Sequence, residues 1–321
     1  GMADPIPIVK ECALKRGCFI NEDGRLCFPK ALVEDVIANA SQNIQLMGRD
    51  AKHDLEIGGN RVHTYGGGEA VNMLDVGAST YRPSTLLDIY DAARLTDRMA
   101  NIHAFSRLVV ATDIEDQLSC DINSAYVSAA GTNKHLQLTF AKAANVQPTL
   151  EMLYMIAGGE KKYHERPFAN GGGCPVISPL RYGKENSEVC VESIKLGAPI
   201  WVIVAPQAGA TAPAALAGAV VQSVAEALAG LLMIDVVQPG FPVVLGPWPF
   251  VSDLRSGSFT GGSGEEAVVS AGAAQMVNFY DLPSSVGAGT VSYTHLTLPT
   301  NCFKCSCGGG GGECEGGGGG G

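Results

Sequence analysis

The chain has 321 residues, of which 46% are hydrophobic and only 17% are charged. This composition excludes a disordered protein over most of the length, because disordered chains are poor in apolar residues. Lys and Arg number 22 against 32 Asp and Glu, which gives a net charge of −10 and excludes the basic surface that a nucleic-acid partner would require.

The first 80 residues predict a small N-terminal cap region of mixed structure. Residues 31–40 (ALVEDVIANA) have the spacing of an amphipathic helix. Further on, Gly66 to Gly68 separate two short apolar pieces, one with Tyr65 and one with Met73, and this pattern predicts a hairpin.

From Thr85 onward the pattern changes to regular alternation. Thr85 and Asp88 have the spacing of a capping box, so a helix is expected to begin there and to run to about Met99. After it, apolar extended runs are predicted at 108–111, 136–140, 174–177, 201–204 and 243–245, and helices near 117–130, 145–158, 185–196, 212–236 and 265–280. Repeated βα units of this kind indicate a parallel sheet.

Among parallel α/β folds, the sequence favours an incomplete (β/α)8 TIM barrel over residues 81–290. The doubly wound alternative would show a GxGxxG fingerprint after its first strand, and none follows a predicted strand here. The predicted units number five, with a sixth beginning near Val286, whereas a complete barrel has eight in about 250 residues. We therefore expect a barrel that is cut short at its C-terminal end.

Residues 212–234 are the one candidate for a membrane span. Gln222, Ser223 and Glu226 lie in the middle of this segment, and a carboxylate inside a membrane is costly, so a buried helix is expected instead. The N-terminus lacks the apolar run of a signal peptide, and the cysteines before residue 291 form no CxxC pair. A cytoplasmic protein with free thiols and no membrane contact is expected.

Residues 291–321 differ from the rest of the chain. Residues 291–301 (VSYTHLTLPTN) resemble the translated read-through of a sequencing adapter, and a cysteine-bearing segment and glycine runs follow. A zinc or redox cluster is one alternative for these cysteines, but CFKCSC (302–307) has no His and is not accompanied by a second CxxC pair. A flexible cysteine-bearing tail is another. We expect residues 291–321 to be a non-biological tail.

The loops after the predicted strands hold the candidate site, because barrel active sites assemble at that end. In APQAGATAP, Gln207 places a polar group in an apolar run, Gly209 permits special backbone geometry, and Thr211 is expected to cap the next helix. An ordinary helix start is the alternative reading of this segment.

Aromatic residues at two further strand ends suggest a site for a cation. Phe140, Trp248 and Phe250 are expected to face a quaternary ammonium group across the barrel mouth, with Asp113 as counter-charge. Simple packing of these aromatic rings, and a solvated loop carboxylate at Asp113, are the alternatives. The histidines include no HxH or HExxH pattern, so no metal site is expected.

Six segments resemble the trimethylamine methyltransferase (MttB-like) family in order and spacing. They are RPSTLLDIYDAARL (82–95), TNKHLQL (132–138), CPVISPLRY (174–182), APQAGATAPAALAGAVV (205–221), VVQPGFPVVLG (236–246) and GGSGEEAVVSAGAAQMVNFYDLP (261–283). The resemblance implies a TIM-barrel enzyme that passes a methyl group from a small methylated amine to the Co(I) of a separate corrinoid protein. It also implies that the chain binds no cofactor itself.

Because Co(I) is the nucleophile in this chemistry, the chain needs no nucleophile of its own, and no residue is assigned a catalytic role. Family members with pyrrolysine act on trimethylamine, and members without it act on quaternary amines such as glycine betaine. No pyrrolysine is present in the sequence, but its expected position lies near or beyond residue 290, so the subfamily stays open. Homo-oligomerisation is a further expectation.

Two other functions are compatible with the residues. One is a methylated-amine-binding module without catalysis, which the aromatic residues and the lack of an acid–base pair suggest. The other is a different barrel enzyme such as a lyase, which is expected to show a lysine or a metal cluster at the strand ends.

Overall fold

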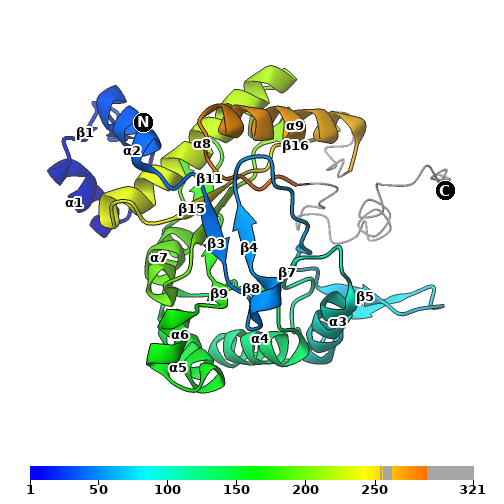
Figure 1. Cartoon of the computed structure of the whole chain (residues 1–321). Helices are drawn as coiled ribbons and strands as arrows, with labels where there is room; N and C mark the ends of the chain where they lie inside the picture. Colours follow the sequence, from blue (N-terminus) through cyan, green and yellow to red (C-terminus); the bar gives the residue numbers. More distant parts are fainter. Residues whose placement is uncertain (254, 256–261, 288–321) are drawn as a thin grey trace.

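The computed structural model describes residues 1–253, 255 and 262–287, so the predicted tail at 291–321 lies outside the described residues. Helices lie in an arc around a set of short parallel strands (Figure 1). The α/β class predicted from the alternating pattern is confirmed.

Two three-stranded parallel sheets form the centre of the fold. One contains β7 (Ala104–Ser106), β8 (His135–Gln137) and β9 (Ala169–Asn170), and the other contains β10 (Gly172–Gly173), β13 (Ile200–Val204) and β15 (Val243–Pro247). Only Gly171 separates β9 from β10, and its carbonyl accepts a hydrogen bond from the Trp201 N–H at 3.1 Å. The two sheets therefore follow one another in chain order, as successive strands of a βα barrel do.

Helices of ordinary length connect these strands. They are α3 (Leu86–Arg98), α4 (Gln117–Gly131), α5 (Val146–Ala157), α6 (Glu160–Glu165), α7 (Lys184–Ser193), α8 (Leu216–Val237) and α9 (Gly264–Phe279), with 3-10 turns at Ala143–Asn145 and Ile194–Leu196. The predicted capping box of α3 is confirmed, since Asp88 Oδ2 accepts from the Thr85 N–H at 2.8 Å. Asp116 caps α4 in the same manner, accepting from the Ser119 N–H at 2.7 Å.

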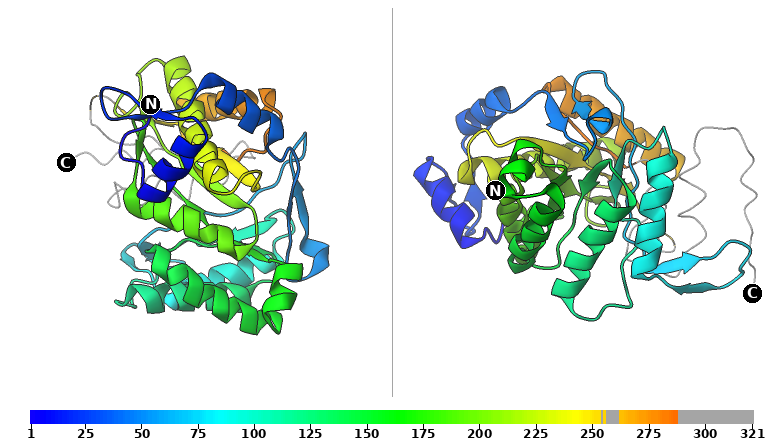
Figure 2. Two further views of the ribbon diagram at one scale, coloured as in Figure 1. Left: turned by 90° about the vertical axis from the view of Figure 1, so that its left-hand side faces the viewer. Right: turned by 60° about the horizontal axis from the view of Figure 1, so that its bottom comes forward.

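The segment before α3 is mixed, as predicted. It contains α1 (Pro7–Lys15), β1 (Phe19–Ile20), β2 (Leu26–Cys27), α2 (Lys30–Asn39), β3 (Ile44–Leu46), a 3-10 turn (Ala51–His53), β4 (Leu55–Ile57), β5 (Asn72–Leu74) and β6 (Tyr81–Pro83). Met2, Ile6 and Val9 share one apolar core with α8, and Figure 2 shows α1 against that helix. The boundary at residue 80 stays a prediction.

The long helix α8 is the centre of this core. Its length and hydropathy are sufficient for a membrane span, but 67% of its most apolar window is buried inside the protein. Glu226 is fully buried in α8, and its carboxylate accepts from the Leu180 N–H at 2.9 Å and from Gln222 Nε2 at 3.0 Å. The expected core helix is therefore confirmed.

Two expectations about strands need correction. The strand expected at 108–111 lies at 104–106, and the parallel strand expected at 174–177 is formed by residues 169–173. Val176–Ile177 (β11) instead pairs antiparallel with Arg181–Tyr182 (β12). The apolar pattern alone does not show which neighbouring piece joins the sheet, because pairing partners come from distant parts of the chain.

The hairpin expected around Gly66 to Gly68 was also wrong. The hairpin in this region is β5–β6, whereas Tyr65 and Ala70 on either side of the glycines form parallel bridges to Ala104 and Val109. The glycine loop thus lies along the edge of the parallel sheet beside β7.

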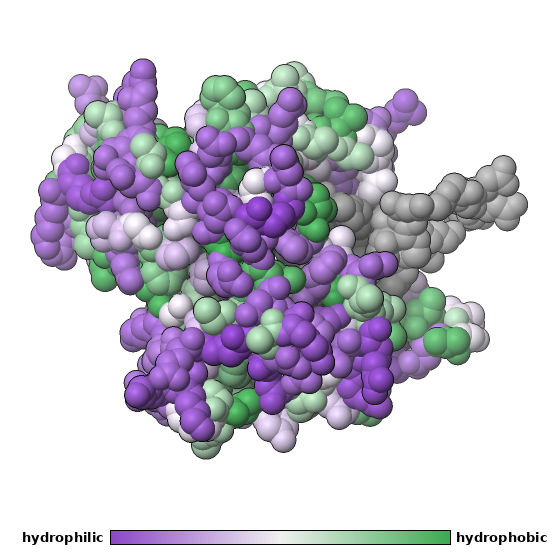
Figure 3. All heavy atoms as spheres, in the orientation of Figure 1, coloured by the Kyte–Doolittle hydropathy of each residue, from purple (hydrophilic) through white to green (hydrophobic). Residues whose placement is uncertain are grey.

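The strands that the structure describes do not close into a barrel. Beyond β15, Ser284 forms a parallel bridge to Leu245, close to the expected sixth strand near Val286. Hydrophilic side chains cover most of the face over β3 and β4, and apolar ones gather toward its edge at α8 and α9 (Figure 3).

Candidate active site

A cavity of about 710 Å³ lies at the carboxyl ends of the parallel strands, and we call it the strand-end cavity. A lining residue follows five of the six parallel strands: Arg107 after β7, Thr139 after β8, Cys174 after β10, Ala205 after β13 and Trp248 after β15. This is the end of a βα fold at which ligands bind, because the loops from several strands meet there.

Four charged residues line the strand-end cavity within the described part of the chain, namely Glu69, Glu115, Asp121 and Arg107. Three carboxylates against one guanidinium leave the lining with a formal charge of −2 when all are ionised. A cavity of this sign attracts a cation.

Glu69 and Arg107 form a partly buried ion pair in the cavity wall. Arg107 Nη2 lies 2.9 Å from Glu69 Oε1, and Arg107 Nε donates to the same oxygen at 3.1 Å. The Thr139 hydroxyl also donates to Oε1. Three donors from two different strand ends therefore hold one oxygen of this carboxylate.

Asp121 is buried in α4 and connects this helix to the loop that carries Phe140. Its Oδ2 accepts from the Ala141 N–H at 2.9 Å and from Asn145 Nδ2 at 2.7 Å. Burial raises the pKa of this carboxyl, and the two hydrogen bonds oppose that rise. The Asp121 carboxyl thus positions the 139–145 loop.

Cys174 and Tyr65 also line the cavity, Cys174 just after β10 and Tyr65 beside β7. The Cys174 thiol is accessible from the cavity, but the protein around it excludes bulk water and raises its pKa to about 11, and the Glu69 charge adds to the rise. Burial likewise raises the pKa of Tyr65 to about 12, although its hydroxyl contacts Ser285 Oγ at 2.6 Å. Both groups are therefore neutral at pH 7.

Four residues of the predicted site line the strand-end cavity. They are Phe140, Gln207, Trp248 and Phe250. Gln207 lies opposite Phe250 in the short parallel pair of β14 (Gln207–Ala208) and β16 (Phe250–Val251), and Trp248 Nε1 donates to the Ser285 carbonyl at 3.0 Å. The structure thus gathers aromatic groups from two strand ends, as the cation hypothesis requires.

The other three predicted residues lie outside the cavity lining. Asp113 Oδ1 accepts from the Leu86 N–H at 2.9 Å, so this carboxylate serves the first turn of α3. Thr211 does not cap α8, whose N-cap is Ala215, because its Oγ1 accepts from the Gln207 N–H at 2.9 Å. Gly209 has φ +87°, which confirms the special backbone geometry expected there. These three residues do not line the cavity, so their predicted role in substrate binding gains no support from it.

Sequence reasoning missed the charged part of the site. Glu69 follows the glycines that were assigned to a hairpin turn, and Arg107 lies just past a strand that was placed a few residues too late. The sequence shows Glu69 only as a single acidic residue after three glycines. This pattern is common in surface loops, so it does not by itself indicate a binding site.

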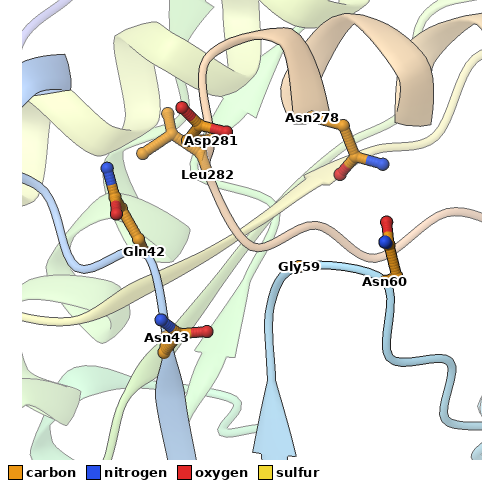
Figure 4. A pocket seen from close by; sticks show the side chains of 7 residues that line it. All are labelled: Gln42, Asn43, Gly59, Asn60, Asn278, Asp281 and Leu282. Carbon is orange, nitrogen blue, oxygen red and sulfur yellow. The ribbon is translucent and has the colours of Figure 1, made fainter.

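Figure 4 shows a second, smaller pocket of about 190 Å³. Three separate segments form it, from the start of β3, the end of β4 and the end of α9, and its lining includes Asn43, Asn60, Asn278 and Asp281. None of the predicted site residues lines it. Within the described ranges, no group of three or more His, Cys, Asp and Glu is placed to hold a metal ion.

Residues 6–295 match the sequence model of the family described as trimethylamine methyltransferase (MTTB). The chain belongs to this family. Among curated relatives, trimethylamine methyltransferase MttB of Desulfitobacterium hafniense (strain DSM 10664 / DCB-2) is 33% identical over 263 residues, covering 82% of this chain and 53% of the relative. MttB1 of Methanosarcina mazei is 31% identical over 291 residues, covering 89% of this chain and 58% of the relative.

A third relative carries a different substrate in its name. The glycine betaine methyltransferase of Desulfitobacterium hafniense (strain Y51) is 27% identical over 273 residues, covering 84% of this chain and 56% of the relative. The resemblance to the methylamine methyltransferases is thus confirmed. The chain spans little more than half the length of these curated relatives.

Proposed function

We propose that the chain is the amine-binding part of a methyltransferase that moves a methyl group from a methylated amine to the Co(I) of a corrinoid protein. The observation that carries the proposal is the strand-end cavity, which combines aromatic side chains with an excess of carboxylates in a member of this family. Aromatic faces and negative charge are the groups that recognise a methylated ammonium ion.

The finer architecture that we propose is a (β/α)8 TIM barrel of which the described residues form one part. The strands follow one another in chain order around an arc, and the Leu245–Ser284 bridge extends this order beyond β15. A cytoplasmic location and a separate corrinoid protein as partner belong to the same proposal, and homo-oligomerisation stays a prediction.

The reaction is a displacement at the methyl carbon. Co(I) attacks that carbon, the C–N bond breaks, the amine leaves with the electron pair, and methyl–Co(III) is the product. The chain's own task is to hold the ammonium group so that the methyl carbon points toward the incoming cobalt, and positioning of this kind accelerates a reaction without any protein nucleophile. At about 710 Å³ the cavity is in the size range of ligand pockets in general, so it is large enough for a small methylated amine.

Methyl transfer is tested with a full-length version of the protein, because the chain spans little more than half the length of its curated relatives and is expected to be inactive alone. The full-length protein is mixed with cob(I)alamin under reducing, anaerobic conditions, and trimethylamine or glycine betaine is added. The expected result is loss of the Co(I) absorption, appearance of methylcobalamin and formation of the amine with one methyl group fewer. An amine that binds without any methyl–cobalt product would favour the alternative of a binding module. Absence of both binding and transfer would reject the proposed function.

A further inference from the structure

We propose that the Glu69 carboxylate binds the positively charged nitrogen group of the ligand in the strand-end cavity. This inference rests on the proposed function in one respect, namely that the ligand is a methylated ammonium ion. It assigns the counter-charge to Glu69 in place of Asp113, whose carboxylate serves the start of α3.

The hydrogen bonds of Glu69 leave one of its oxygens for a ligand. Within the described residues, Arg107 and Thr139 both donate to Oε1, and Oε2 receives no hydrogen bond. The side chain lines the cavity and keeps 22% of its surface exposed. The anchored oxygen fixes the carboxylate, and the second oxygen is the one that faces no protein donor.

The backbone at Glu69 is also held in an unusual position. Its φ is +48°, a left-handed conformation that non-glycine residues rarely adopt because it is sterically strained. Ala70 pairs with the strand-like segment next to it, since its N–H donates to the Leu108 carbonyl at 2.9 Å and its carbonyl accepts from the Val110 N–H at 2.9 Å. These bonds keep Glu69 at the cavity despite the strain.

A second polar atom in the same wall lacks a partner. Gln137 is 6% exposed, lines the cavity, and its Oε1 has no hydrogen-bond donor among the described residues. A buried acceptor without a donor carries a free-energy cost for the folded protein. A cationic ligand beside this carbonyl oxygen would lower that cost.

Arg107 does not cancel the attraction for a cation. It balances Glu69, but Glu115 and Asp121 leave the lining negative, and Trp248 and Phe250 add aromatic surface. A quaternary ammonium group has no N–H donor, so it binds through diffuse charge and aromatic contact rather than through hydrogen bonds. One free carboxylate oxygen in an aromatic cavity fits that chemistry.

The simpler alternative is that Glu69 only neutralises Arg107. Glu69→Gln alone does not separate the two roles, because it leaves Arg107 unpaired and so changes the charge of the cavity. The double variant Glu69→Gln/Arg107→Gln removes one negative and one positive charge and therefore keeps the net charge of the lining. If Glu69 contacts the ligand directly, the double variant still binds choline weakly. If Glu69 acts only by neutralising Arg107, the double variant regains the wild-type affinity for choline.

The test measures binding of choline and of 3,3-dimethyl-1-butanol by calorimetry, because these probes have the same shape and differ in charge. We expect Glu69→Gln and the double variant each to weaken choline binding at least about tenfold and to leave binding of the neutral probe within about twofold. Glu115→Gln is the matched control, since it removes one carboxylate from the same cavity, and it should weaken choline binding less than about threefold.

Several results would overturn the proposal. They are a wild-type chain that does not prefer choline, a double variant that regains wild-type choline affinity, a control variant as weak as Glu69→Gln, and an equal loss for both probes. If Glu69→Gln does not fold, Glu69→Gly replaces it, because glycine accepts the left-handed backbone and also removes the carboxylate. Methyl transfer is assayed separately, so choline selectivity that depends on Glu69 without any transfer would reject the proposed function and keep this inference.

Discussion

Gly172 in β10 lies opposite Trp201 in β13, and a Cβ atom at position 172 would lie 2.3 Å from the Trp201 carbonyl oxygen. The two backbones therefore approach more closely than any other residue type permits. This contact lies where the two parallel sheets follow one another, and Gly172 also lines the strand-end cavity. Gly172 is therefore needed for the close pairing of β10 with β13 and also forms part of the cavity wall.

Gly172→Ala is expected to destabilise the protein by about 3 kcal/mol or more, because the added methyl group meets backbone atoms that cannot rotate away. Gly264→Ala is the matched control, since a Cβ there has no neighbour within 4 Å among the described residues, and it should change stability by less than about 1 kcal/mol. Urea denaturation of both variants measures the difference. Equal stability of the two variants would contradict the close approach.

Asp88→Ala is expected to reduce stability by about 1 to 2 kcal/mol, because the variant loses the capping box at the start of α3. Asp91→Ala, on the exposed part of the same helix, should have almost no effect. The Arg82 guanidinium holds the pKa of Asp88 at about 2, so the stabilisation from its charge is present above the ordinary pKa of aspartate and is lost as the pH falls through about 2. Unfolding curves between neutral and acidic pH test both points, and equal losses for the two variants would reject the role of the cap.

Trp248→Leu is expected to weaken choline binding about 3- to 30-fold, because leucine keeps apolar bulk but removes the aromatic face. Binding of 3,3-dimethyl-1-butanol should change less, since this neutral probe gains nothing from a cation–π contact. Phe279→Leu, at the exposed end of α9, is the control and should leave both affinities unchanged. An equal effect on the two probes would show that Trp248 contributes packing alone.

His135 is expected to make the stability of the protein depend on pH. It is fully buried, with Nδ1 2.8 Å from the Met47 carbonyl oxygen and Nε2 3.0 Å from Asn170 Oδ1, and burial lowers its pKa. The unfolded chain therefore takes up a proton at a higher pH than the folded chain, so stability should fall as the pH drops below about 6.5. Denaturation of wild type and His135→Gln between pH 5 and 8 measures this slope, which should be smaller in the variant. Identical slopes would show that another group is responsible.

Local signals predicted most of the helices correctly. The capping box at Thr85 and Asp88 specified the start of α3, and apolar spacing located α4, α5, α8 and α9 within a few residues. These features involve neighbours in the chain, so the sequence shows them directly. The aromatic residues that line the cavity were also predicted, because they follow strands whose order the alternating pattern reveals.

What the sequence by itself determined is the α/β class, the helices, the resemblance to the methyltransferase family and the presence of aromatic residues just after two of the strands. Only the tertiary structure decided that residues 169–173 rather than 174–177 join the parallel sheet, and that Glu69 and Arg107 supply the charges while Asp113 serves a helix. Helix caps and periodicity depend on residues a few positions apart, whereas strand pairing and ion pairs depend on segments that meet only when the chain has folded. The glycine loop before Glu69 illustrates this difference, since its place in the cavity follows from pairing with β7 and with the segment after it.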